Sequence, residues 1–166
     1  MNAQLELCES LDEACDRYDN GYYKEKLEQG LIFQDFIAHE FYKRGIVIVG
    51  FGSKKYQIQH GENLLGAEIK RDGNFRTTGN LYIEVAEKSH PSKPSYVPSG
   101  IMRDDNSWLF VIGDEQTVWM FSTKQLRTVH EKRGWREVKK ATSIARLMPI
   151  AEADTCCIQK FEFGDN

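Results

Sequence analysis

Short β-rich runs constrain the fold of this chain most, because they alternate with turn residues and are bordered by two helical patterns. Prolines and serines between residues 89 and 99 predict an extended loop, a candidate flap beside a cleft, that divides these runs into two groups. The order of elements predicts an α/β (α+β) domain with a mixed β-sheet flanked by helices, in which the first group of strands is antiparallel. The predicted strands span residues 46–52, 54–61, 64–72, 80–89, 107–114, 117–122 and 143–150.

A helix is predicted over residues 31–44, where apolar residues share one helical stripe and Gly45 provides a natural stop. Glu40 falls in the middle of this stripe. A buried carboxylate is costly unless it pairs with a cation, accepts hydrogen bonds or binds a metal, so we expect Glu40 to do one of these. The apolar members of the stripe are Phe33, Phe36, Ile37 and Phe41.

The composition is typical of a globular protein, with 40% hydrophobic and 28% charged residues. No run of about 18 apolar residues occurs, so we expect no membrane span. The first residues are acidic and lack the basic start and apolar run of a secretory signal, which favours a cytoplasmic location. The four cysteines are then expected to be reduced thiols, and their spacing is unsuited to a zinc site.

The chemistry-bearing segment is GENLLGAEIKRD, residues 61–72. Glu68 and Lys70 are two positions apart in a strand pattern, which places both on the same face, and Glu62 precedes them. Carboxylate oxygens are the ligands that Mg²⁺ prefers, and a neighbouring lysine can orient or deprotonate an attacking water and offset phosphate charge. The alternative is an ordinary Glu/Lys pair on a solvent-facing strand.

The segment resembles the PD-(D/E)XK nuclease superfamily, which has the restriction-endonuclease-like fold. The resemblance lies in Gly61-Glu62, in Glu68-Ile69-Lys70 followed by Asp72, and in the run TTGNLYIE at residues 77–84, and it covers roughly residues 30–90. It implies a restriction-endonuclease-like core and hydrolysis of phosphodiester bonds with Mg²⁺ or Mn²⁺. We accordingly expect a single nuclease-like domain over residues 1–166, with residues 1–29 as a helical appendage.

The resemblance also implies roles for individual residues. Glu62 takes the place of the strand acid, Glu68 and Lys70 form the E-x-K pair, and Glu40 matches the helix acid. Glu84, on the next predicted strand, either joins the metal shell or pairs with a basic neighbour. Because a metal centre takes ligands from several elements, we expect Glu40, Glu62 and Glu68 to converge on one cleft.

The net charge of −3 is unevenly distributed, and residues 124–146 are locally basic. This segment includes a helix predicted over residues 123–133, capped by Ser122 or Thr123. It is either a phosphate-contacting face or a solvated surface. Candidate nucleic-acid contacts are Arg71, Arg76 and Asn80 beside the E-x-K segment, and Lys124, Arg127, Arg133, Arg136 and Lys139 in the basic segment.

Three functions remain open. The first is a magnesium-dependent endonuclease acting on nucleic acid, with DNA favoured by the resemblance and with a two-fold homodimer expected if both strands of a duplex are cut. The second is a catalytically inactive module on the same fold that binds nucleic acid or protein. The third is a regulatory or inhibitor domain whose acidic N-terminal region contacts a partner.

Four aromatic residues of the later predicted strands are expected in the core, namely Trp108, Phe110, Trp119 and Phe121.

Overall fold

The computed structural model describes residues 11–164, which form a mixed α+β protein. Residues 1–10, with Cys8 and the start of the predicted appendage, lie outside the described part. The helices among the described residues are α1 (Leu11–Arg17), α2 (Tyr23–Tyr42), α3 (Lys54–His60), α4 (Phe75–Thr78), α5 (Thr123–Arg133) and α6 (Ile150–Cys156), with the π-helical turn η1 (Tyr18–Tyr22) and the 3-10 turn η2 (Gly100–Met102). The strands are β1 (Ala67–Arg71), β2 (Asn80–Glu87), β3 (Val97–Pro98), β4 (Leu109–Gly113), β5 (Thr117–Ser122), β6 (Glu137–Lys139), β7 (Ser143–Pro149) and β8 (Gln159–Glu162).

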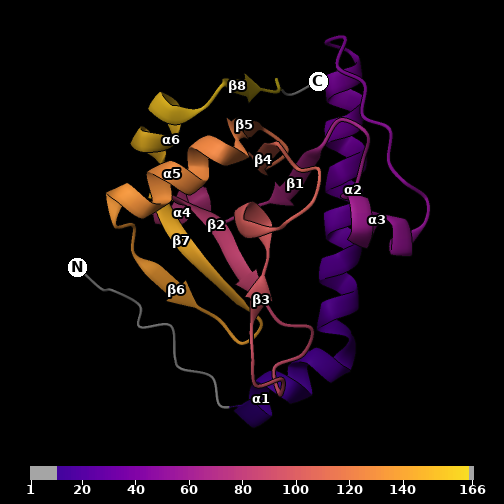
Figure 1. Ribbon diagram of the computed structural model, residues 1–166, viewed down its shortest axis with the longest axis vertical. Coiled ribbons are helices and arrows are strands. Elements are labelled where there is room, and N and C mark those ends of the chain that lie inside the picture. The colour runs from indigo at the N-terminus through magenta and orange to yellow at the C-terminus, as the bar shows by residue number, and fades with distance from the viewer. Residues whose placement is uncertain (1–10, 165–166) are drawn as a thin grey trace.

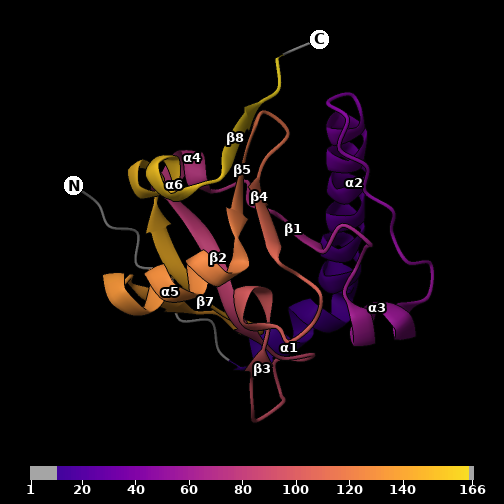
Figure 2. The same ribbon diagram turned by 45° about the horizontal axis from the view of Figure 1, so that its top comes forward.

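The strands form two four-stranded sheets. In the mixed sheet the order is β1-β4-β5-β8, and β1 runs parallel to β4. The antiparallel sheet has the order β3-β2-β7-β6. In Figure 2 the strands of the mixed sheet lie side by side with α2 beyond β1, and Figure 1 shows α5 and α6 on the other side, beside the antiparallel sheet.

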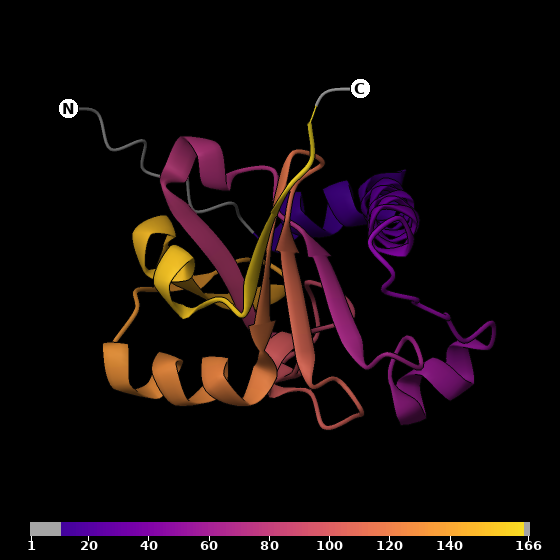
Figure 3. The same ribbon diagram turned by 90° about the horizontal axis from the view of Figure 1, so that it is seen from above.

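Helix α2 packs on one face of the mixed sheet through the predicted apolar stripe. Phe33, Ile37 and Phe41 are fully buried in a cluster with Ala67 and Ile69 of β1. Seen from above, α2 covers one side of the mixed sheet, while β2, α5 and α6 lie on its other side (Figure 3). Since side chains alternate along a strand, the same packing turns Glu68 and Lys70 of β1 away from α2.

A second cluster fills the space between the two sheets, α5 and α6. Strand β4 supplies both clusters, because Leu109 and Val111 face α2 whereas Phe110 and Ile112 face the antiparallel sheet. A strand that is covered on both faces reads as a continuous apolar run, which is the pattern of this segment. The cluster joins β2 to β4 and β5, and so fixes the strand that carries Glu84 relative to the mixed sheet.

The structure corrects the predicted antiparallel set. Residues 54–61 are not a strand, since they contain α3. Ser53 caps the start of this helix, its hydroxyl accepting from the Tyr56 backbone N–H, and Gly61 follows its end with a positive φ of 90°. Residues 46–52 form no strand beyond an isolated bridge between Gly50 and Asn63. Only residues 64–72 and 80–89 of this group contain strands, and β1 finds its partner in parallel β4 instead.

Other predicted elements agree with the structure. Helix α2 ends at Tyr42, two residues before the predicted end, and begins at Tyr23, so the boundary of the predicted appendage at residue 29 falls inside it. Helix α5 has the predicted bounds and is capped by Ser122.

Trp108 departs from the expected core position, because its side chain is 58% exposed while its indole N–H donates to the carbonyl of Leu65 at 2.7 Å. In the described part of the chain, no helix combines the length and apolar character needed to cross a membrane.

Asn63 holds the start of β1, because its buried amide donates to the Ala67 carbonyl at 2.7 Å and accepts from the Ala67 N–H at 3.0 Å. Asn63→Ala leaves these buried backbone groups unpaired, and we expect it to lower the free energy of unfolding by about 2 kcal/mol. Gln59→Ala, at an exposed position on α3, is the control and should change it by less than about 0.5 kcal/mol. Urea denaturation measures both. Equal midpoints for the two variants would contradict this role of Asn63.

Candidate functional site

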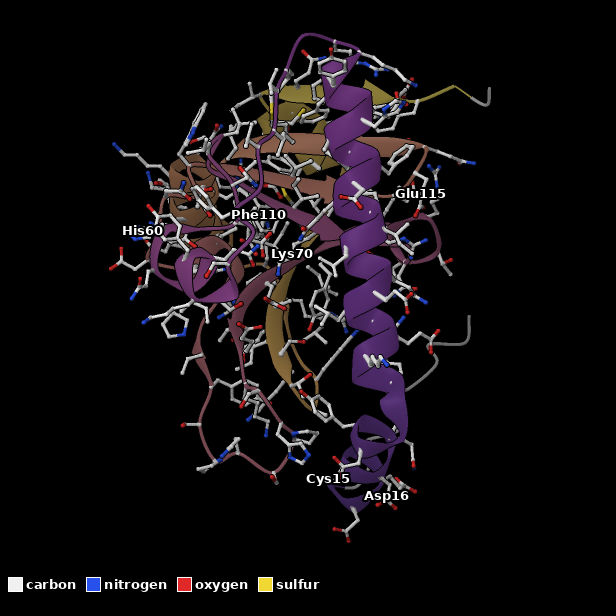
Figure 4. All side chains as sticks on the ribbon, turned by 90° about the vertical axis from the view of Figure 1, so that its right-hand side faces the viewer. Cys15, Asp16, His60, Lys70, Phe110 and Glu115 are labelled. Carbon is white, nitrogen blue, oxygen red and sulfur yellow. The ribbon has the colours of Figure 1, made fainter. Side chains whose placement is uncertain are left out.

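The side chains of Glu68 and Lys70 form the centre of the candidate site. The Glu68 carboxylate is buried, with 1% of the side chain exposed, and its Oε1 lies 2.9 Å from Lys70 Nζ. Lys70 itself is 34% exposed, and its Nζ is 3.8 Å from Oε1 of Glu84 on β2. In the view of Figure 4, Lys70 is seen between the ribbons of α2 and of the segment that carries α3. An ammonium group therefore joins two carboxylates from two different sheets.

Glu84 is positioned by the turn η2. The Ser99 hydroxyl donates to Glu84 Oε1 at 2.6 Å, and the next residue, Gly100, has a positive φ of 52°. A Cβ at Gly100 would lie 2.3 Å from the Glu84 backbone oxygen, so only glycine permits this close approach. Burial raises the pKa of Glu84 above its usual range, although the Lys70 charge and the Ser99 hydrogen bond act in the opposite direction.

Arg103, just after η2, is a second cation of the site. Its Nη1 lies 3.6 Å from Glu68 Oε2 and 3.8 Å from Glu62 Oε1. The guanidinium is held by Asp105, with Nε to Oδ2 at 2.7 Å, and by the Gln57 carbonyl of α3 at 3.1 Å. Arg103 thus ties the acidic residues to α3 and to the loop that leads into β4.

Helix α2 contributes Gln34 to the site. Its side-chain amide donates to Glu62 Oε2 at 3.0 Å. Glu62 therefore lies between an amide from α2 and the guanidinium of Arg103. This contact places α2 at the edge of the acidic cluster.

The electrostatics of the cluster keep Lys70 protonated. Burial alone lowers its pKa, but the charges of Glu68 and Glu84 outweigh burial and raise the pKa of Lys70 above its ordinary value. Both Glu68 oxygens are buried and, within the described part of the chain, receive no hydrogen bond of normal geometry, so their partners are the ionic contacts with Lys70 and Arg103. Glu68 thus retains acceptor capacity in a site where two cations balance its charge.

Carboxylate oxygens of Glu62, Glu68 and Glu84 are the kind of ligand that suits Mg²⁺ or Mn²⁺. Among the described residues, no three acidic, histidine or cysteine side chains already stand as a compact metal-binding group. In this arrangement Lys70 and Arg103 lie beside the oxygens that would hold the ion. The donor chemistry therefore fits a divalent cation, because Lys70 and Arg103 offset only part of the negative charge of the three carboxylates.

The structure brings Glu62, Glu68, Lys70 and Glu84 together, but it places Glu40 elsewhere. The Glu40 carboxylate pairs with its helical neighbours Lys43 at 2.5 Å and Arg44 at 2.8 Å, whose hydrogen bonds lower its pKa. The position that reaches the site is Gln34, six residues earlier and about 9 Å along the helix. The expected convergence of Glu40 with Glu68 is thus replaced by a local ion pair, and we leave Glu40 out of the site.

The basic residues next to the E-x-K segment are already paired. Arg71 binds Glu115 through two contacts, the shorter at 2.7 Å, and Arg76 binds Asp114 at 2.6 Å. These pairs tie the end of β1 and helix α4 to the turn between β4 and β5. The Asn80 side chain donates to the nearby carbonyl of Thr78 at 2.7 Å.

The basic segment after residue 123 divides into structural and exposed residues. Arg127 donates to the backbone carbonyls of Ile101 and Arg103, so it fixes the loop that carries Arg103. Arg133 pairs with Glu152 at 3.0 Å. The remaining candidates of the segment are exposed, and they are Lys124, Arg136 and Lys139.

Sequence reasoning missed Ser99, Arg103 and Gln34. Ser99 lies at the end of the loop that was predicted as a candidate flap, but neither its contact with Glu84 nor a role in the site was predicted. Arg103 follows Met102 and precedes two aspartates, and no local pattern distinguishes it from a surface arginine. Gln34 borders the apolar stripe of α2, where a polar residue is normal.

Comparisons of this chain with known protein families, with curated proteins and with solved structures found no match. The arrangement of the side chains is therefore the evidence on function.

The opposite pKa shifts of Glu84 and Glu40 predict opposite effects of pH on stability. An acid with a raised folded-state pKa destabilises the folded state when it ionises. The contribution of Glu84 to the free energy of unfolding therefore falls as pH rises from the ordinary pKa range of glutamate through the raised pKa of Glu84. We expect Glu84→Gln to gain stability relative to the parent as pH rises from about 4, the ordinary range of glutamate, through the raised pKa of Glu84. Urea denaturation across that range measures the difference.

Glu40→Gln is the matched control for this measurement. Because the Glu40 pKa is lowered, its ionised form stabilises the folded state, and that contribution is lost as pH falls through the lowered value. The Gln variant should therefore lose stability relative to the parent as pH rises. If both variants followed the same trend, the assignment of a buried, desolvated carboxylate at Glu84 would be incorrect.

Proposed function

We propose that this protein is a metal-dependent nuclease that hydrolyses phosphodiester bonds of nucleic acid, most simply an endodeoxyribonuclease, on a restriction-endonuclease-like core. The observation that carries the proposal is the contact of Lys70 with both Glu68 and Glu84, because it joins the E-x-K pair to a second acid on β2, in the other sheet. The packing of α2 against the strand that bears the pair also supports this core.

In this proposal Glu68 and Glu84 hold Mg²⁺ or Mn²⁺, with Glu62 as a further acid at the edge of the site. The bound ion lowers the pKa of a water molecule and offsets charge on the phosphate. Glu68 suits its role because its buried oxygens have acceptor capacity that ionic contacts alone occupy. Glu84 suits its role because burial destabilises its charge, so a cation beside it is favoured.

Lys70 acts as an electrostatic group rather than as the base. Its raised pKa keeps the ammonium charged at neutral pH, so it has no lone pair with which to take a proton from water. A fixed ammonium beside the buried Glu68 can instead donate a hydrogen bond to the attacking water or to a phosphate oxygen. Arg103 adds a second fixed positive charge on the other side of Glu68, at 3.6 Å.

A cleavage assay with plasmid DNA, single-stranded DNA and RNA in Mg²⁺ or Mn²⁺ tests the proposal. Lys70→Ala is expected to reduce cleavage by at least about 100-fold, because it removes charge stabilisation from the transition state. Glu68→Gln is expected to abolish cleavage and also to weaken divalent-cation binding, measured by titration calorimetry, because it removes a ligand. Glu131→Gln and Lys124→Ala, at exposed positions of α5, are the charge-matched controls.

Removing one partner of a buried ion pair can itself destabilise a domain by about 3–5 kcal/mol, so circular dichroism and urea denaturation must accompany these assays. The double variant Lys70→Ala, Glu68→Gln removes both charges together and keeps the fold testable. Parental cleavage by this double variant, once it is shown to be folded, would refute the site. A parent protein that neither cuts nucleic acid nor binds a divalent cation would instead favour the inactive binding module.

A further inference from the structure

A group of lysines surrounds two tyrosines at the end of the antiparallel sheet. Lys88 and Lys139 place their ammonium groups 5.0 Å and 5.2 Å from the centre of the Tyr96 ring. Lys140 lies 4.6 Å from the centre of the Tyr82 ring. We call this surface the lysine–tyrosine patch.

The position of the patch is fixed by hydrogen bonds to the backbone. The Tyr96 hydroxyl donates to the Lys140 carbonyl at 2.8 Å, which joins the loop before β3 to the turn after β6. Lys88 Nζ donates to the carbonyls of Pro91 and Lys93 at 2.5 Å and 3.1 Å. Because the aromatic faces and the backbone order the ammonium groups, less side-chain entropy is lost when they meet an anion.

The positive charge of the patch is not balanced by ion pairs. No carboxylate of the described residues lies within salt-bridge distance of the ammonium groups of Lys88, Lys139 or Lys140, although the exposed Glu87 is near in sequence. A pocket of about 380 Å³ adjoins the patch between Lys88 and Lys93. This locally positive surface contrasts with the net charge of −3 of the whole chain.

The patch continues from the candidate site along β2. Tyr82 is two residues before Glu84 on the same face of the strand, about 7 Å away. Lys88 follows Glu84 by four residues, just after the end of β2 and beyond a β-bulge between Glu84 and Ala86, so the two lie at most about 13 Å apart along the strand direction. That span corresponds to about four nucleotides of a duplex strand, at roughly 3.4 Å each.

We propose that the lysine–tyrosine patch binds the phosphate backbone of the nucleic-acid strand that enters the Glu68–Lys70–Glu84 site. This inference rests on the proposed nuclease function and names where its substrate lies. The ammonium groups contact phosphates of one strand, so the binding is independent of base sequence and decreases steeply with salt. The basic residues of α5 are not part of this path.

Binding of a fluorescently labelled DNA duplex, measured by anisotropy without divalent cation at several salt concentrations, tests the patch. The double variant Lys139→Ala, Lys140→Ala is expected to bind at least about tenfold more weakly and to reduce the slope of log K against log salt by about 1.8, or about 0.9 for each lost phosphate contact. Neither ammonium group of this pair donates to the loop backbone, in contrast to Lys88, so the variant should remain folded.

The matched control is the double variant Lys124→Ala, Lys132→Ala, which removes the same charge from exposed positions of α5. It should retain the parental affinity and slope. Equal weakening by both double variants would mean that only net charge matters, and parental binding by Lys139→Ala, Lys140→Ala would remove the patch from the substrate path.

The two proposals can fail separately. If Lys70→Ala abolishes cleavage but the patch variant binds as the parent does, the nuclease stands and the patch does not. If binding depends on the patch while the parent never cleaves with Mg²⁺ or Mn²⁺, the proposal of nucleic-acid binding by the patch is supported and the proposal of nuclease activity is refuted. A single-stranded oligonucleotide in the same assay shows whether the path takes one strand alone, since its expected slope is about 0.7 for each phosphate contact.

Discussion

The charge of Glu68 is the constraint around which the candidate site is arranged. An ionised carboxylate with 1% exposure is strongly unfavourable unless cations lie beside it, and Lys70 and Arg103 supply them at 2.9 Å and 3.6 Å. These two cations come from different parts of the chain, one from the same strand and one from the loop after η2. The burial of one acid therefore requires β1, η2 and the segment around Glu62 to meet at one place.

The same arrangement explains the positions that do not touch Glu68. Arg127 of α5 donates to the carbonyls of Ile101 and Arg103, and Gly100 lets η2 approach the backbone of Glu84. Arg103 can reach Glu68 only while this loop keeps its path. Several features that are unremarkable one at a time thus act together to hold two cations beside one carboxylate.

The sequence predicted the structure correctly in segments where one periodic pattern of side chains determines which residues face the core. Alternation along β1 placed Glu68 and Lys70 on one face, and the stripe of α2 correctly identified Phe33, Ile37 and Phe41 as core. The sequence was misleading in segments whose secondary structure depends on the parts of the chain that they contact in the fold. Residues 46–52 have strand-forming side chains but find no neighbouring strand within the described residues, and α3 depends on its cap at Ser53 and its stop at Gly61.

Glu40 illustrates why the composition of a site is harder to predict than its strands. Its place in the apolar stripe correctly indicated burial, but burial requires only a partner, and Lys43 and Arg44 are available one turn away. A periodic pattern cannot separate a local ion pair from a ligand. Arg103 is a site residue that no sequence pattern indicates. Its contacts with Glu62 and Glu68 form only because the fold brings distant parts of the chain together.

The distribution of charge separates residues that support the structure from residues that can meet a ligand. Arg71, Arg76 and Arg133 are cations in the sequence, but each is neutralised by an acid in the fold, as Arg127 is engaged with backbone. Counting basic residues along a segment therefore overestimates its capacity for phosphate. The lysines on Tyr82 and Tyr96 differ, because an aromatic face orders an ammonium group without cancelling its charge. Because Tyr82 lies on β2, the strand that bears Glu84, we propose this surface rather than the more basic α5 as the one that meets a polyanion.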